Sequence, residues 1–264
     1  MMFSRILEYL KLCKSGYIHR MPMRCLIGKI LRDNYEYSFV ESKNSEFCKN
    51  SSLTWQGSYA KASYKDQNED TMWCDLHSST LRCMASLSAV YKGDPLNIID
   101  IGGGIGSTYH ASKKLCPHFK FNKWIVIEDK KVAEYARSEV KDQVLEFHED
   151  FSTLNSEIHI DLVFCSGSFF YISNSYQVFS KILNLNPRCI SLPRTAMTEK
   201  EEDVFSVQKI RDHHFVPLYF AQKFKLIEMA KSHYHLQFEC LETVGAFRIA
   251  DEVINMYWLF FRRQ

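Results

Sequence analysis

The sequence predicts an α/β protein with an open, mostly parallel β-sheet and helices on both of its faces. Three observations support this fold class. Short apolar runs typical of buried strands alternate with stretches of helical periodicity through the middle of the chain. A glycine-rich turn follows the first of these strands. Near the end of the chain, two β-rich runs at 245–249 and 254–261 predict a hairpin that completes the sheet with an antiparallel strand.

The first strand of the sheet, over residues 97–101, ends in a carboxylate and a cluster of glycines. Asp100 lies near its end, and Gly102, Gly104 and Gly106 follow before a predicted helix begins. Because glycine has no Cβ, such a turn lets a ligand approach the backbone, and the N–H groups of the helix start face that ligand. We therefore predict a nucleotide-type ligand at this turn. A tight glycine turn without a ligand is the alternative.

A second apolar strand, over residues 123–127, is followed by Glu128. This acid follows Gly106 at close to the separation of about 20 residues found for ribose-binding acids in nucleotide sites. A carboxylate here accepts hydrogen bonds from both ribose hydroxyls. The alternative is a solvated acid at a strand end, beside Asp129. Together, the two motifs favour a cofactor that contains a nucleoside.

The remaining elements follow from hydrophobic periodicity. Upstream of the first strand we expect one helix, over 70–91, that packs on the domain. Further along the chain we expect helices over 107–115, 130–140, 176–183 and 216–233, and strands over 144–147, 160–168 and 189–192. The predicted division is a helical and loop extension, 1–92, followed by the α/β domain, 93–264.

Composition narrows the function classes. The net charge of +2 argues against a nucleic-acid binder that relies on bulk electrostatics. The nine cysteines form an odd set without a Cys-x-x-Cys pair, which favours a reducing cytosol over a disulfide framework or a zinc site. No apolar run reaches the length of about 18 residues that a membrane span needs, and no secretory signal is evident. We therefore expect a cytoplasmic protein.

The N-terminal residues 1–32 carry seven Lys and Arg residues and one acid, Glu8. Two short helices are expected here, one ending near Gly16 and one after Pro22. A basic amphipathic face of this kind predicts weak contact with an anionic membrane surface, at the inner face of the membrane. The alternative is a helical extension that packs on its own domain.

The glycine motif Asp100-x-Gly102-x-Gly104-x-Gly106 resembles the first motif of class I S-adenosylmethionine-dependent methyltransferases. Ser107 occupies the place of the third glycine of the dinucleotide fingerprint, which disfavours a nicotinamide cofactor. The resemblance implies a Rossmann-like methyltransferase sheet and S-adenosylmethionine as the cofactor. In that family the acid closes the first strand, and the glycines pass under the methionine part of the cofactor.

The chain also resembles a narrower group of methyltransferases encoded with bacterial surface-polysaccharide genes, such as those for O-antigen and capsule. The matching segments are Trp55–Tyr59, Asp100–Tyr109, Trp124–Glu128, Ser166-Gly167 with Tyr171-Ile172, and Arg194-Thr195. This resemblance implies methylation of a sugar hydroxyl, on a glycan or on a nucleotide- or lipid-linked sugar. Pro193 departs from the group, which has an acid before the arginine, so no role for an acid is carried over to that position.

The class I resemblance also implies further cofactor contacts. An acid after the third strand meets the adenine amino group, and Asp150 is preferred over Glu149 for this role, with the apolar Phe151 against the adenine ring. Ser166 ends the fourth strand, whose carboxyl end faces the crevice where open α/β sheets bind ligands.

Methyl transfer to a hydroxyl needs a group that removes the proton, and histidine suits this near neutral pH. His213 or His214, oriented by Asp212, is the predicted base, in a polar stretch between the fifth strand and the following helix. A solvated loop is the alternative. We predict no metal, because adjacent histidines point apart and no third ligand is near. Arg194 is predicted to hold a phosphate or carboxylate of the acceptor. Tyr109 and His110 are secondary candidates for the base.

Two other classes of function remain open in the sequence. One is a non-catalytic nucleotide-binding or scaffold module with a degenerate cofactor site. The other is a different enzyme on the same fold, such as a nicotinamide oxidoreductase, an aminopropyl transferase or a methyltransferase acting on a small molecule other than a sugar.

Overall fold

The computed structural model describes residues 37–38, 73–154, 158–210, 214–249 and 252–264. The chain from Tyr37 to Gln264 forms one compact unit. The predicted N-terminal helices, the Trp55–Tyr59 segment and the predicted membrane contact lie outside the described residues. Within the described residues, no helix combines the length and hydropathy that a membrane span requires.

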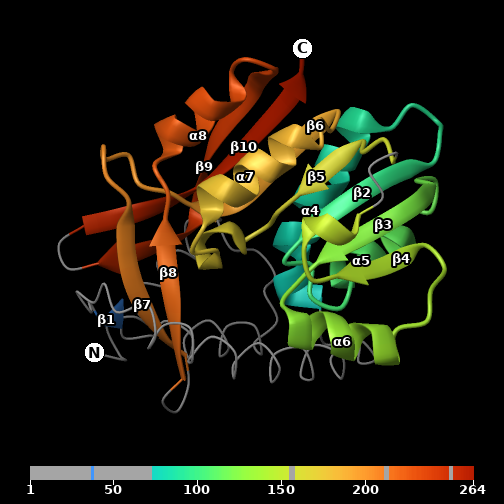
Figure 1. Ribbon diagram of the computed structural model, residues 1–264, viewed down its shortest axis with the longest axis horizontal. Coiled ribbons are helices and arrows are strands. Elements are labelled where there is room, and N and C mark those ends of the chain that lie inside the picture. Colours follow the sequence, from blue (N-terminus) through green and yellow to red (C-terminus); the bar gives the residue numbers. More distant parts are fainter. Residues whose placement is uncertain (1–36, 39–72, 155–157, 211–213, 250–251) are drawn as a thin grey trace, which may run out of the picture. The chain divides into compact units, whose positions relative to one another are not determined.

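A seven-stranded sheet forms the centre of the protein, in the order β4-β3-β2-β5-β6-β10-β9 (Figure 1). The strands are β2 (Leu96–Ile101), β3 (Phe121–Ile127), β4 (Leu145–His148), β5 (Leu162–Phe164), β6 (Cys189–Ala196), β9 (Tyr234–Ile249) and β10 (Glu252–Arg263). Strands β2 to β6 are parallel, and β10 lies antiparallel to both β6 and β9. The predicted sheet, including its antiparallel C-terminal strand, is confirmed.

Helices cover both faces of this sheet, as Figure 1 shows. The strands alternate between two hydrophobic cores, so that in β2 Ile98 packs into one core and Ile99 into the other. Among the described residues, side chains of the three α-helices before residue 140 join the first core, and side chains of the two later α-helices join the second. These are α4 (Trp73–Val90), α5 (Ser107–Leu115) and α6 (Lys130–Glu139), then α7 (Ser175–Asn184) and α8 (Lys223–Ala230).

Helix α4 confirms most of the helix predicted over 70–91. Its buried residues Cys83, Leu87 and Val90 contribute to the same core as Ile98 of β2 and Leu162 of β5. The division of the chain at residues 92 and 93 stays a prediction, but the helix before it is part of the packed α/β core.

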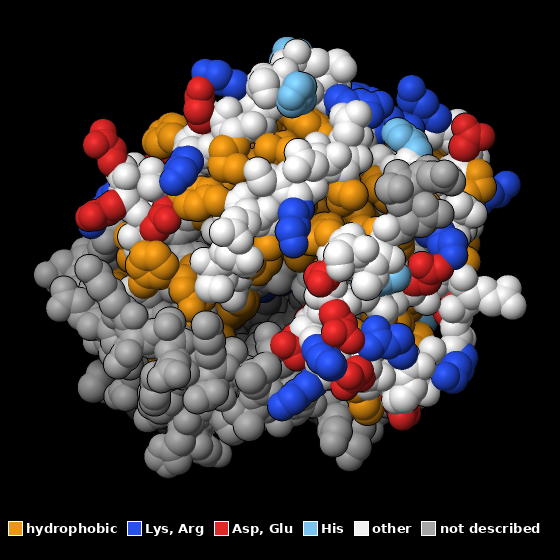
Figure 2. Space-filling model, viewed as in Figure 1, with side chains coloured by type: hydrophobic (Ala, Val, Ile, Leu, Met, Phe, Trp, Pro, Cys, Tyr) orange, Lys and Arg blue, Asp and Glu red, His pale blue; other side chains and the backbone are white. Residues whose placement is uncertain are grey.

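Helix α6 is held by a capping residue and by one apolar face. The Asp129 side chain accepts a hydrogen bond from the Lys131 N–H, which caps the helix directly after Glu128. Val132, Ala133 and Ala136 are buried against the sheet. Acidic and basic side chains lie close together in the region of this helix in Figure 2. The cap and the buried face together fix where the chain leaves β3.

The helix predicted over 216–233 is wrong in its first half. Residues His214–Phe220 form strand β8, which pairs with β7 (Val204–Ile210) in a small antiparallel sheet of order β1-β7-β8, where β1 is Tyr37–Ser38. The buried residues Val216, Leu218 and Phe220 alternate along β8, which is strand periodicity. Pro217 has no N–H for a helix interior, but is tolerated in a strand at a sheet edge.

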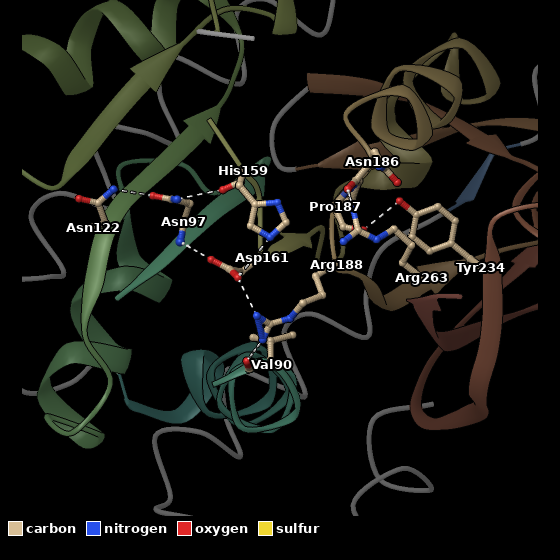
Figure 3. Close-up of polar contacts among 10 residues, drawn as sticks. All are labelled: Val90, Asn97, Asn122, His159, Asp161, Asn186, Pro187, Arg188, Tyr234 and Arg263. Carbon is tan, nitrogen blue, oxygen red and sulfur yellow. Dashed lines mark hydrogen bonds and ion pairs between the residues drawn. The ribbon is translucent and has the colours of Figure 1, made fainter. Parts of the chain in front are cut away.

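The amino-terminal edge of the large sheet is closed by a polar cluster (Figure 3). Asp161 accepts hydrogen bonds from the backbone N–H of Asn97 at 2.9 Å and from Nη1 of Arg188 at 3.0 Å. Arg188 also donates Nη2 to the carbonyl oxygen of Val90. This cluster joins the starts of β2, β5 and β6 to the end of α4. The carboxyl ends of these strands lie at the opposite edge of the sheet, where open α/β sheets bind ligands.

Candidate cofactor site

The glycine turn lies at the point where the strand order of the sheet reverses. Strands β3 and β4 lie on one side of β2, and β5 and β6 lie on the other. At such a reversal the carboxyl ends of neighbouring strands border a crevice, which is where open α/β sheets bind ligands. Gly102 donates its N–H to the carbonyl oxygen of Ile127 at 2.9 Å, so the turn stays attached to the end of β3.

The three motif glycines of the turn have a left-handed backbone, and at two of them a side chain would also collide with the protein. Gly102, Gly104 and Gly106 have φ of 70°, 62° and 86°, a left-handed backbone that favours glycine. A Cβ on Gly102 would lie 2.3 Å from Cβ of Ser168, and one on Gly106 would lie 2.5 Å from a methyl carbon of Leu145. A Cβ on Gly104 would meet no atom of the described residues within 4 Å. The turn is therefore packed against the protein at Gly102 and Gly106, and open to a ligand at Gly104.

We expect Gly102→Ala to destabilise the fold by about 2–4 kcal/mol, from the left-handed backbone together with overpacking against Ser168. Urea unfolding of the variant and the wild type measures the change. The double variant Gly102→Ala with Ser168→Gly removes the atom that the new methyl group meets, so it should recover part of the loss relative to Ser168→Gly alone. Equal losses in both backgrounds would contradict this account of the contact.

Asp100 is buried at the base of the turn rather than exposed in the crevice. It is 2% exposed, and one of its oxygens accepts a hydrogen bond from Nε1 of Trp124 at 3.3 Å. Burial raises the pKa of this carboxyl to about 7; the Trp124 bond opposes the shift and the charge of Glu128 adds to it. A Cβ on Gly103 would lie 2.6 Å from the Asp100 carboxyl, so the turn packs directly on this acid.

Glu128 is the acid that joins the turn to the end of β3. Its Oε1 accepts the N–H of Gly104 at 3.0 Å, and its Oε2 accepts the N–H of Asp129 at 2.9 Å. Burial raises the pKa of this carboxyl, and the two backbone hydrogen bonds oppose that rise. Each carboxylate oxygen accepts one of these hydrogen bonds and has a second lone pair that can accept another. The structure thus brings the two predicted halves of the site together, with acceptor capacity left on both oxygens.

Two further predicted contacts lie after the carboxyl ends of β4 and β5, on opposite sides of β2 and β3. Asp150 follows β4, is exposed, and caps the short helix Phe151–Thr153 by accepting the Ser152 N–H at 2.6 Å. Glu149, the alternative, forms an ion pair with Arg137 at 3.1 Å. Both acids thus have a partner within the protein, since the Asp150 carboxylate also accepts the Ser152 hydroxyl. The preference for Asp150 over Glu149 stays a prediction.

Ser166 follows β5, and its hydroxyl lies 2.9 Å from the Ser79 hydroxyl of α4. Ser168, which the sequence argument did not single out, donates its hydroxyl to the Ile101 carbonyl oxygen at 2.7 Å. It ties the end of β5 to the glycine turn. The only signal for it was its place at the end of a predicted strand, among small residues.

The predicted base lies in a different setting from the one expected. Residues 211–213 connect β7 to β8, so the stretch joins two strands of a hairpin instead of leading into a helix. Asp212 and His213 lie outside the described residues. His214 begins β8, opposite Ile210, and its side chain is also outside the described part. The proposal that one of these histidines is the base stays a prediction.

Of the secondary candidates, Tyr109 has a structural role. Its ring is buried beside Trp124 and Phe121, and its hydroxyl donates to Oδ2 of Asp142 at 3.0 Å. His110 is half-buried, and burial lowers its pKa. In the described part of the chain, no group of three or more potential metal-ligating side chains forms a metal site.

Arg194 lies at the carboxyl end of β6 and donates Nη1 to the Ser79 hydroxyl at 2.8 Å. The structure therefore places Arg194, Ser79 and Ser166 in one group beside the crevice. Asp100, Gly102, Gly104, Gly106 and Glu128 form the adjoining group, whereas Asp150 and Phe151 follow the outer strand β4.

The fold has counterparts among solved structures. One is the 1,6-didemethyltoxoflavin-N1-methyltransferase of Burkholderia thailandensis, solved with 1,6-didemethyltoxoflavin and S-adenosylhomocysteine; the TM-score is 0.54 at 12% identity, over 88% of this chain and 96% of that chain. Another comes from the complex between the Haloferax volcanii Trm112 methyltransferase activator and a methyltransferase, with a TM-score of 0.51 at 11% identity, over 81% of this chain and 96% of that chain. No protein-family model matches the sequence, and no curated protein matches it.

These likenesses, at low identity, establish the fold. The chain has the Rossmann-like α/β fold of S-adenosylmethionine-dependent methyltransferases, with a mostly parallel sheet and helices on both faces.

Proposed function

We propose that this protein is an S-adenosylmethionine-dependent methyltransferase. The observation that carries the proposal is the link between Glu128 and the glycine turn. The Gly104 N–H donates to Oε1 of Glu128, and among the described residues no atom lies within 4 Å of where a Gly104 Cβ would be, unlike at Gly102 and Gly106. A ligand that lies over Gly104 is therefore within reach of a carboxylate that still has lone pairs for two hydroxyls, and a ribose supplies two such hydroxyls.

The residues of the site suit this cofactor better than a pyrophosphate-bearing one. A dinucleotide would place its anionic pyrophosphate at the start of the helix after the turn. Here two carboxylates, Asp100 and Glu128, lie at the turn, and each has a raised pKa because of burial. A ligand with a cationic ammonium and sulfonium group is favoured beside them, since an opposite charge stabilises the ionised carboxylates.

When bound, S-adenosylmethionine supplies an electrophilic methyl group. In the proposed roles, Glu128 holds the ribose, the Gly104 backbone lies under the amino-acid part, and Asp150 with Phe151 accommodates the adenine. Ser166 borders the same crevice from β5. The chain's contribution to the rate is then alignment of the acceptor with the methyl group and removal of the acceptor's proton.

For the acceptor we propose a sugar hydroxyl on a bacterial surface glycan or its nucleotide- or lipid-linked precursor. The support is the sequence resemblance to methyltransferases encoded with surface-polysaccharide genes. His213 or His214, with Asp212, is the proposed base. Weak membrane contact through residues 1–32 is a further proposal, which fits a lipid-linked acceptor.

Calorimetric titration of the purified protein tests the proposed cofactor. S-adenosylhomocysteine should bind with a Kd in the micromolar range, about −8 kcal/mol. NAD should bind far more weakly, because the turn lacks the third glycine of the dinucleotide fingerprint. Equal or tighter binding of NAD would overturn the proposal, and so would the absence of binding by S-adenosylhomocysteine and S-adenosylmethionine.

A further inference from the structure

Arg194 has a backbone conformation that is unusual for its residue type. Its φ is 53°, in the left-handed region that a non-glycine residue rarely adopts. Strand β6 is bulged at this point: Thr195 pairs with Tyr257 and Leu192 pairs with Leu259, so Pro193 and Arg194 together lie opposite Trp258 alone. A bulge changes the direction in which a side chain leaves a strand, and bulges are common next to active sites.

A buried carboxylate holds the bulge in place. Glu242 of β9, which is 7% exposed, accepts the backbone N–H of Arg194 at 3.3 Å. The same carboxylate accepts Nε of Arg82 at 2.6 Å and also forms an ion pair with Nη2 of Arg82. The charge of Glu242 is thus balanced by Arg82, and the Arg194 guanidinium is not the partner of that carboxylate.

The Arg194 guanidinium retains most of its hydrogen-bonding capacity. A guanidinium has five N–H donors in a planar fork, and among the described residues its one hydrogen bond is from Nη1 to the Ser79 hydroxyl. It forms no ion pair with a carboxylate of those residues. The guanidinium packs over Gly167, where an added Cβ would lie 3.6 Å from Cζ of Arg194. The side chain is only partly buried, so a ligand can reach it.

Gly167, over which the Arg194 guanidinium packs, lies directly before a residue that packs on the glycine turn. The next residue, Ser168, donates its hydroxyl to the Ile101 carbonyl oxygen and fills the space beside Gly102. The guanidinium therefore lies beside the end of β5, next to the glycine turn, at the edge of the sheet where the cofactor is proposed to bind.

We propose that Arg194 is an oxyanion-binding residue of the acceptor site, so that the acceptor carries a phosphate or a carboxylate close to its methylated group. An arginine with free donors recognises both anions in a bidentate manner. The inference rests on the proposed methyl transfer and specifies the acceptor's chemistry: an anionic molecule such as a sugar phosphate or an acidic sugar. A neutral sugar would leave this cation without a counterpart.

Inorganic pyrophosphate is the probe for this site, titrated into the protein in the presence of saturating S-adenosylhomocysteine. The wild type should bind the probe, more weakly as salt is raised. Arg194→Asn should weaken binding at least about tenfold, because hydrogen bonds to a charged group are lost. Asparagine tolerates a left-handed backbone, so this variant should keep the fold. Arg194→Lys keeps the charge without the planar fork and should bind with intermediate affinity.

Arg262→Asn is the matched control. Arg262 is an exposed residue of β10 that pairs with Cys189 at the start of β6, the opposite end of that strand from Arg194. Its loss changes the net charge equally and should leave pyrophosphate binding unchanged. If Arg194→Asn binds the probe as tightly as the wild type does, the proposal is overturned.

A second comparison separates the acceptor from the cofactor's own carboxylate. S-adenosylhomocysteine carries that carboxylate, and 5′-methylthioadenosine does not. If Arg194→Asn weakens binding of the former alone, and the former displaces pyrophosphate from the wild type, Arg194 serves the cofactor and the acceptor proposal fails. Pyrophosphate can also be titrated into the free protein, without S-adenosylhomocysteine. Absence of S-adenosylhomocysteine binding then counts against the methyltransferase proposal, whereas equal pyrophosphate binding by the wild type and Arg194→Asn counts against this one.

Discussion

Gly104→Val is expected to abolish binding of S-adenosylhomocysteine while the protein stays folded. The new side chain would project from the motif glycine at which no described residue lies within 4 Å of an added Cβ, and so would fill the space proposed for the cofactor. If the wild type binds in the micromolar range, a shift beyond the millimolar range is a loss of at least about 4 kcal/mol. Calorimetric titration measures the affinity, and circular dichroism checks the fold.

Gly93→Val is the matched control for backbone strain. Gly93 also has a positive φ, 105°, and a Cβ there would also meet no atom of the described part of the chain within 4 Å. It lies between α4 and β2, at the other end of β2 from the glycine turn. Both variants therefore place a valine at a position of positive φ without a collision of its Cβ with the described residues. Only Gly104→Val should affect binding. Comparable affinities in the two variants would place the ligand away from the turn.

Asp100→Asn is expected to stabilise the free protein at pH 8 and to change its stability little at pH 4. The pKa of Asp100 is raised from 3.8 to about 7 by burial. Between these values the folded state keeps a proton that the unfolded state releases, so the wild type loses stability as pH rises. Above pH 7 the difference of about three units between the two pKa values lowers the free energy of unfolding of the wild type by about 4 kcal/mol. Asparagine has no acidic proton to lose, so the variant does not show this loss.

Urea unfolding across this pH range measures the effect. Asparagine retains an oxygen that accepts the Trp124 N–H, so the local packing should persist. Asp161→Asn makes the same chemical change in a carboxylate that is paired with Arg188, and it should destabilise the protein because it removes that ion pair. A flat pH dependence in the wild type, or destabilisation by Asp100→Asn at pH 8, would contradict the assigned role of burial.

The sequence by itself determined the parts of the protein that depend on neighbouring residues. Periodicity within short windows identified the five parallel strands and the helices between them, because burial of a strand or of a helix face is recorded in consecutive residues. The glycine turn was predicted for the same reason, since the left-handed backbone of Gly102, Gly104 and Gly106 favours glycine. Glu128 was predicted from its spacing after that turn.

Only the tertiary structure decided what depends on contacts between distant segments. Nothing near Arg194 in sequence shows that Glu242 of β9 accepts its N–H, or that a bulge opposite Trp258 sets the direction of its side chain. The hairpin of β7 and β8 was missed because the apolar residues of β8 and α8 merge into one run, and the pairing with β7 decided the strand. The first outcome depends on pairing between strands far apart in the chain, and the second on the pairing of two consecutive strands. Local periodicity carries no information about the register of either pairing.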